Sequence, residues 1–328
     1  MTECASTGNE RFTFPPPYCG GCGEDSVSAI CRGSLQRQGI QKAHWECWSE
    51  CNLSCPFCFR TNGQLLDTED VVRLLRALST GAIRAVVFAG GDPSLRPDLP
   101  EVAAEALMLG LAVQIQTNAQ HVTRSFLSAL RNCEYVGLSL DGPDAPTHDG
   151  FRGKPGNFRH VISLLDQLDR LGVPVSVRTV VGKANHRAVP QMARLVASYS
   201  NVICWKLLEF TAVGSGFVNR DRYALPSDAF ERTVLASREG LGGSDQLLDV
   251  LRNVDKVGIY MMISSQGLVY GTTETALART GRHQYIGSVL SDHLGYLAQR
   301  IPFSSHRRID RRLLADTGVR SSDRPSVG

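Results

Sequence analysis

Three closely spaced cysteines are the strongest chemical signal in this chain. Cys51, Cys55 and Cys58 lie in the run C-N-L-S-C-P-F-C, which has the spacing C-x3-C-x2-C. Thiolates this close in sequence can converge on one metal centre, and cysteine is the usual ligand of each iron in a 4Fe–4S cluster. Three local cysteines leave the fourth iron open to a small molecule. Two alternatives remain: a zinc site that takes a fourth ligand, or buried apolar thiols.

Further polar residues stand where apolar, strand-like runs end. One run ends in A-G-G-D-P, and glycines at such a point let a ligand approach the backbone. Others end in Q-T-N-A and in S-L-D-G-P, where a hydroxyl and a carboxylate two residues apart share a face and suit a ribose diol. Ordinary turn chemistry and strand-end capping explain each motif as well. The candidate residues are Gly90, Gly91, Asp92, Pro93, Thr117, Asn118, Ser139 and Asp141.

Two arginines complete this set of candidates. Arg152 follows the fourth strand-like run in H-D-G-F-R-G-K, and Arg178 interrupts the apolar run V-P-V-S-V-R-T-V-V. A cation in an apolar strand needs a partner. The carboxylate of a cofactor, a substrate phosphate or a structural salt bridge would each serve.

The cysteine spacing, with Phe57 before the last cysteine, resembles the radical S-adenosylmethionine (SAM) superfamily. In that family the open iron chelates the amino and carboxylate groups of SAM. One electron then cleaves SAM to methionine and a 5'-deoxyadenosyl radical, which abstracts a hydrogen atom from an unreactive carbon. The resemblance implies a 4Fe–4S cluster, SAM, and an external flavodoxin- or ferredoxin-like electron donor.

The resemblance also implies residue roles. The three cysteines hold three irons, and Phe57 lies close to the adenine. G-G-D-P is similar to the family's G-G-E-P, with Asp92 in place of Glu, and implies contact with the amino group of SAM. Q-T-N-A is similar to T-N-G. Ser139, Asp141 and Arg178 are expected at the ribose or the carboxylate.

The substrate side is expected further along the chain. Lys206 and Glu209 lie in C-W-K-L-L-E-F, which resembles molybdenum-cofactor GTP cyclases of the superfamily. W-K followed by S-D-x-F-E resembles viperin, which acts on a nucleoside triphosphate. We therefore predict a small polar substrate, such as a nucleoside, nucleotide or sugar, in a biosynthetic pathway, with an antibiotic-forming pathway among the alternatives. Lys206, Glu209, Tyr260 and Tyr270 are the candidate substrate residues.

Two other functions remain open. A peptide-modifying maturase would use residues 1–40 to bind a leader or a cluster, and a zinc- or cluster-bearing regulator would bind metal without catalysis. No cysteine follows Cys204, so we expect no C-terminal auxiliary cluster. Cys19, Cys22 and Cys31 could form a second zinc or iron–sulfur site, with Cys4 or Cys47 as the fourth ligand. A thiol-bearing extension without metal is the alternative.

Strand-like and helix-like segments must position these residues. They alternate from about residue 43 to 225, and six β/α units predict a parallel sheet with right-handed crossovers. We therefore expect an α/β fold, a partial (β/α)6 TIM-like barrel. In such barrels the reactive groups lie at the carboxyl ends of the strands, where the cysteines follow the first strand. The predicted division is a Cys/Gly/Pro-rich extension at 1–40, a core at 41–225, a smaller α/β appendix at 226–303 and a basic tail at 304–328.

Composition narrows the class of protein. The chain has 328 residues, 42% of them hydrophobic, and a net charge of +3. Residues 304–328 hold six arginines and three aspartates and so carry all of that excess. The neutral remainder argues against a nucleic-acid groove. The polar N-terminus and the lack of a long apolar run predict a cytoplasmic protein with no membrane span, in a compartment where ten cysteines stay reduced.

Overall fold

The computed structural model describes residues 41–60, 63–81, 83–243, 247–256, 261–271 and 284–301. The predicted second metal site at Cys19, Cys22 and Cys31 and the basic tail lie outside these residues. Within the described part of the chain, no helix combines the length and the apolar character needed to cross a bilayer.

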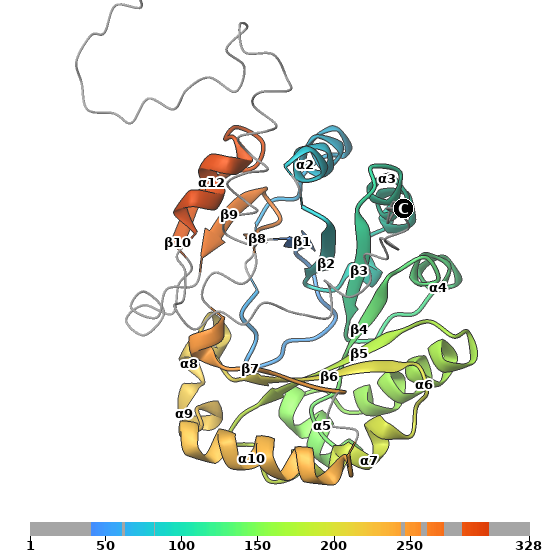
Figure 1. Ribbon diagram of the computed structural model, residues 1–328, viewed down its shortest axis with the longest axis vertical. Coiled ribbons are helices and arrows are strands. Elements are labelled where there is room, and N and C mark those ends of the chain that lie inside the picture. The colour runs from blue at the N-terminus through green and yellow to red at the C-terminus, as the bar shows by residue number, and fades with distance from the viewer. Residues whose placement is uncertain are drawn as a thin grey trace, which may run out of the picture.

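One sheet of ten strands organises the molecule (Figure 1), in the order β10-β9-β8-β1-β2-β3-β4-β5-β6-β7. The pairs from β8 through β1 to β7 are parallel, whereas β9 and β10 pair antiparallel. The sheet curves but does not close, so the predicted partial barrel is confirmed. The strands are β1 Lys42–Trp48, β2 Ala85–Gly90, β3 Ala112–Thr117, β4 Tyr135–Ser139, β5 Val175–Val181, β6 Val202–Glu209, β7 Leu248–Leu251, β8 Met261–Ile263, β9 Leu268–Gly271 and β10 Gln284–Ser288.

Helices cover the convex face of the curved sheet (Figure 1). They are α2 Thr68–Thr80, α3 Leu99–Met108, α4 Arg124–Leu130, α5 Ala145–Arg152, α6 Asn157–Arg170, α7 Met192–Ala197, α8 Ser215–Val218, α9 Arg220–Tyr223, α10 Ser227–Gly240 and α12 Leu294–Arg300. Asp67 caps α2 as expected, because its side chain accepts from the backbone N–H of Asp70. Ser227, whose hydroxyl makes it a candidate cap from the sequence, is instead the first residue of α10, and Pro226 occupies the cap position without a side-chain bond.

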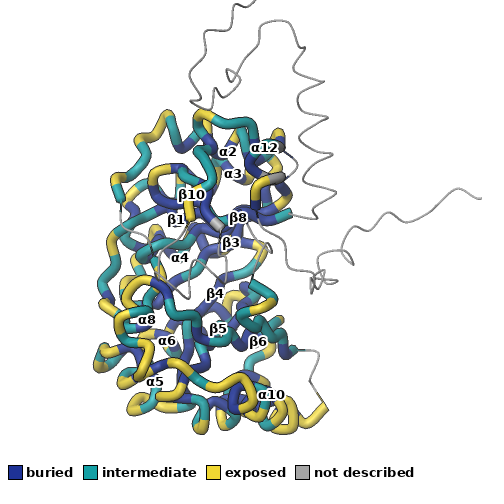
Figure 2. The backbone as a smooth tube through the Cα atoms, turned by 90° about the vertical axis from the view of Figure 1, so that its left-hand side faces the viewer, coloured by how far each residue is buried: buried dark blue, intermediate teal, exposed yellow. Residues whose placement is uncertain are grey.

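The core lies between the strands and these helices. Figure 2 shows buried residues along the strands and exposed ones on outer helices such as α10. The apolar stripe of α2 (Val71, Leu74, Leu75 and Leu78) is buried, as its 3.6-residue period predicts. Alternate residues of β1 divide the same way: Ala43, Trp45 and Cys47 join this core, while Lys42, His44 and Glu46 face the concave side.

Strands of the predicted appendix extend the core sheet instead of forming a second one. β7 pairs with β6, and β8 pairs with β1, so residues after 226 contribute to both sides of the six-stranded core. Within the predicted appendix, the strand-like sequence runs at 258–264 and 268–272 contain β8 and β9. No sequence pattern predicted β7 or β10. The domain limits themselves stay a prediction.

Candidate functional site

The predicted cysteine loop leaves β1 at the carboxyl end of the parallel strands. Cys51, Cys55 and Cys58 are all half-buried. The backbone N–H of Leu53 donates to the Cys51 sulfur at 3.4 Å, and so does the side-chain amide of Asn118 at 3.4 Å. The Cys58 N–H donates to the Cys55 carbonyl at 3.1 Å and folds the end of the loop into a turn. N–H donors aimed at sulfur favour its thiolate form.

The protonation of the cysteine thiols bears on whether this loop can hold a cluster. Burial raises the pKa of the Cys55 thiol to about 11, against the lowering influence of Arg152. Burial also raises the pKa of Cys51. No three His, Cys, Asp or Glu side chains converge into a metal-binding group among the residues described. Thiols must lose their protons to bind metal, so this donor set fits a cluster once the protons are released.

Glycines hold the cysteine loop against the neighbouring strand. Gly90 has φ +118°, and an added Cβ would lie 2.3 Å from the Trp48 carbonyl oxygen. A Cβ on Gly91 would lie 1.8 Å from the Glu50 carbonyl oxygen. The Gly91 N–H donates to Trp48 O at 2.6 Å, which is possible only at this close approach. The glycines therefore let the backbone before Cys51 pack directly on the end of β2.

Asp92 joins the ends of β2 and β3. Its carboxylate is 1% exposed. It accepts from the N–H of Ser94 at 3.0 Å, from the N–H of Asn118 at 2.7 Å and from the Thr117 hydroxyl at 2.9 Å. Pro93 follows at the start of a short 3-10 turn. Protein donors occupy this carboxylate, and its predicted contact with SAM stays a prediction.

Asp141 and Arg152 form a buried ion pair beside the cysteine loop. Arg152 Nε lies 2.7 Å from Asp141 Oδ2, with the side chains 8% and 0% exposed. The other Asp141 oxygen accepts from the Val180 N–H at 2.8 Å. Arg152 also reaches Cys55, with 4.0 Å between Nη1 and the sulfur. The two predicted cofactor residues thus partner each other, and they link β4, β5 and α5 to the cysteines.

Phe57 lies in an aromatic cluster. Its ring is 9% exposed and lies 4.6 Å from the ring of Phe151 and 5.5 Å from that of Tyr223, between ring centroids. Phe210 completes the cluster, and the Arg152 guanidinium lies 5.7 Å from the Phe57 centroid. The cluster anchors the cysteine loop under α5. Contact of Phe57 with an adenine stays a prediction.

A row of polar side chains crosses the concave face of the sheet. Register pairs Ser139 with Arg178, Arg178 with Lys206, and Lys206 with Asp249, so these four share one face. Lys206 Nζ lies 2.6 Å from Asp249 Oδ2. Gly137 leaves room for Arg178, because an added Cβ there would lie 3.2 Å from Arg178 Cδ. Among the residues that the structure describes, none forms an ion pair or a hydrogen bond with the Arg178 guanidinium.

Cationic side chains act on His44 at this face, which also carries the carboxylates of Glu46 and Asp249. Burial, and then the charges of Arg178, Lys42 and Lys206, lower the pKa of His44 well below its ordinary value. Sequence reasoning missed His44 and Glu46. The polar-apolar alternation K-A-H-W-E-C-W was the available signal, since it places Lys42, His44 and Glu46 on one side of β1.

The other predicted substrate residues, Glu209 and Tyr270, lie outside the row formed by Ser139, Arg178, Lys206 and Asp249. Glu209 accepts from the Asn253 N–H at 2.7 Å, and its carbonyl accepts from Lys256. The Tyr270 hydroxyl donates to Glu46 Oε1 at 3.1 Å in a buried contact. Tyr260 lies outside the described residues. Lys256, which the sequence did not single out, is half-buried, and its partial removal from water lowers its pKa to about 7.

Comparison with known proteins places this geometry in a family. The model of the radical SAM superfamily matches residues 45–196. The chain is 32% identical over 185 residues to an Fe-coproporphyrin III synthase from Methanosarcina barkeri, covering 54% of this chain and 46% of that protein. It is 27% identical to an S-adenosylmethionine-dependent nucleotide dehydratase from Lacinutrix mariniflava, covering 52% and 38%.

A solved structure resembles the fold. Streptococcus suis SuiB bound to the precursor peptide SuiA superposes with a TM-score of 0.64 at 16% identity, covering 80% of this chain and 66% of that one. The chain spans about half the length, or less, of the curated relatives it matches. The cysteine loop, the open parallel sheet and the matched segment agree, and residues 45–196 of the protein form a domain of the radical SAM superfamily.

Proposed function

We propose that this protein is a radical SAM enzyme that binds a 4Fe–4S cluster through Cys51, Cys55 and Cys58. The observation that carries the proposal is the position of the cysteine loop, which lies at the carboxyl end of the sheet with the N–H of Leu53 and the amide of Asn118 directed at the Cys51 sulfur. Bound there, the cluster and SAM would supply the radical chemistry of the family. The chain's own residues hold, orient and shield these groups.

The roles we propose near SAM follow from which polar groups are already engaged. The carboxylates of Asp92 and Asp141 accept protein hydrogen bonds, so we assign them the positioning of the Asn118 and Arg152 segments. Ser139 and Arg178 on the concave face are the groups we propose for the ribose and the carboxylate of SAM, or for an anionic substrate. Phe57 would contribute through the aromatic cluster that fixes the loop.

For the substrate we propose a small polar molecule with an anionic group, a nucleotide being the preferred class. Support comes from the cationic character of the concave face, where Arg178, Lys206 and Lys42 all act on His44. A group with phosphate or carboxylate oxygens would satisfy the Arg178 guanidinium bidentately. The similarity to a nucleotide dehydratase agrees with this class.

A peptide-modifying maturase is the second candidate function. It is favoured by the structural likeness to SuiB, which was solved with a precursor peptide. Under this candidate, residues 1–40 bind the peptide, and their removal abolishes peptide binding while leaving the cysteine loop in place.

The enzyme proposal is tested by anaerobic reconstitution with iron and sulfide, followed by addition of dithionite and SAM. Wild type should form 5'-deoxyadenosine and Cys55→Ala should not. Cys133→Ala is the matched control, because Cys133 is a buried thiol that bonds only the Ala129 carbonyl. Zinc instead of iron at the loop, or equal 5'-deoxyadenosine from both cysteine variants, would refute the proposal. Nucleotides, nucleosides and sugars are then compared by how strongly each stimulates 5'-deoxyadenosine formation.

A further inference from the structure

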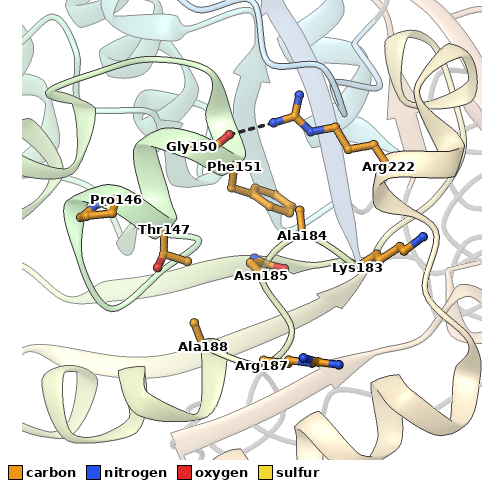
Figure 3. A pocket seen from close by; sticks show the side chains of 10 residues that line it. All are labelled: Pro146, Thr147, Gly150, Phe151, Lys183, Ala184, Asn185, Arg187, Ala188 and Arg222. Carbon is orange, nitrogen blue, oxygen red and sulfur yellow. Dashed lines mark hydrogen bonds between the residues drawn. The ribbon is translucent and has the colours of Figure 1, made fainter.

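Figure 3 shows a surface pocket with the side chains of the ten residues that line it. It has a volume of about 470 Å³ and is formed by the first and last turns of α5, the segment after β5 and the end of α9. These segments follow β4, β5 and β6. Because all of these strands are parallel to β1, the pocket opens at the same end of the sheet as the cysteines.

The polar lining of the pocket is mainly cationic. Lys183, Arg187 and Arg222 line it and are all exposed, and no Asp or Glu is among the lining residues of the described chain. Arg222 donates to the Gly150 carbonyl at 3.2 Å. Lys183 and Arg187 form no ion pair with a described residue. The neighbouring Asp144 carboxylate caps α5 by accepting from the Thr147 N–H. Three solvated positive charges therefore surround one opening.

A single aromatic layer separates this pocket from the cysteine loop. Phe151 forms part of the pocket wall, and its ring lies 4.6 Å from that of Phe57, between Cys55 and Cys58 in the chain. The next residue, Arg152, reaches the Cys55 sulfur. The last turn of α5 thus contacts the pocket through one side chain and the cysteines through the next.

We propose that this pocket is the docking site of the external electron donor, a small acidic protein with a low-potential flavin or iron–sulfur centre. The proposal rests on the radical SAM function above, which consumes an electron that this chain must receive. One electron passes from the reduced donor centre to the cluster, so the donor is oxidised by one electron and the cluster reduced by one. Electron transfer slows steeply with distance, which favours docking where one aromatic layer intervenes. Exposed cations steer an acidic partner and position it.

The test uses reconstituted holoenzyme and two probes, a purified flavodoxin and a purified ferredoxin. The pocket variant is Lys183→Glu/Arg187→Glu/Arg222→Glu. The control variant, Arg76→Glu/Arg131→Glu/Arg170→Glu, changes the net charge equally with exposed residues. Arg76 lies in the second half of α2, Arg131 follows the end of α4 and Arg170 ends α6. The carboxyl ends of these helices lie toward the end of the sheet opposite the cysteines. Binding of each oxidised probe is measured calorimetrically at low and high salt, alongside 5'-deoxyadenosine formation driven by the reduced probe or by dithionite.

The pocket variant should bind the preferred probe at least about tenfold more weakly at low salt, with a smaller loss at high salt. Probe-driven product formation should fall in parallel while dithionite-driven formation stays at the wild-type rate. Equal binding by pocket and control variants, or no binding of either probe to wild type, would overturn the docking site. Absence of dithionite-driven product from wild type would instead count against the enzyme function, because probe binding is measured independently of it.

Discussion

Asp141→Asn should lower the free energy of unfolding by about 3–5 kcal/mol, because it leaves the Arg152 guanidinium buried without its counter-charge. Asp141 is fully buried and the Arg152 side chain is 8% exposed, with 2.7 Å between Nε and Oδ2. Asparagine is nearly isosteric with aspartate, so the change removes charge without opening a cavity.

The magnitude follows from the individual contacts. Losing a hydrogen bond between charged groups costs about 1.5–3 kcal/mol, and the unpaired guanidinium accounts for the rest of the range. The bond from Val180 N–H should survive, because the asparagine Oδ1 can occupy the same place as the Asp141 oxygen that accepts it at 2.8 Å.

Urea unfolding followed by circular dichroism measures the change. The matched control is Asp228→Asn on α10. Its partner Arg232 also lies at 2.7 Å, but both side chains are more than two-thirds exposed, so solvent screens the pair and no measurable change is expected. Similar losses in both variants would refute the reasoning that burial sets the strength of the Asp141 pair.

A double variant separates the pair from its surroundings. Asp141→Asn/Arg152→Met removes both charges, so it should lose less stability than the sum of the two single variants by about 1 kcal/mol or more. Strictly additive losses would mean that the two side chains act independently despite their contact.

Two further predictions concern the cysteine loop. Gly91→Ala should destabilise the protein by about 1–3 kcal/mol and reduce iron incorporation, because the new Cβ would lie 1.8 Å from the Glu50 carbonyl oxygen. Unchanged unfolding and iron content would contradict this prediction. The control is Gly150→Ala on helix α5, where the new Cβ would meet no neighbouring segment within 4 Å, so this variant should be neutral or slightly stabilising. In the metal-free protein, alkylation of Cys55 should accelerate about tenfold per pH unit from pH 7 to 10, because burial raises its pKa to about 11. Mass spectrometry of the peptide measures that rate, and a plateau near pH 8 would show an ordinary thiol.

Local sequence patterns were sufficient to predict the features that depend on residues close together in the sequence. The C-x3-C-x2-C spacing indicated the family because ligands so close in sequence need only a local rearrangement of one loop to reach a common cluster. The six strands of the core and the buried stripe of α2 followed from hydrophobic periodicity, since burial on one face imposes that period. The glycines at 90 and 91 were recognised as a close approach, although their partner is the backbone of the cysteine loop.

Contacts between distant residues decided what sequence reading could not. The carboxylates of Asp92 and Asp141 were predicted to face a ligand, and only the folded chain brings Asn118 and Arg152 to them. Lys206 was singled out as an interrupting charge, yet its partner Asp249 lies on β7, a four-residue strand too short to show a period. Strand pairing also set Ser139, Arg178 and Lys206 in one row. Such pairings depend on which strands become neighbours in the sheet. The residues flanking each position do not specify which strand will pair there.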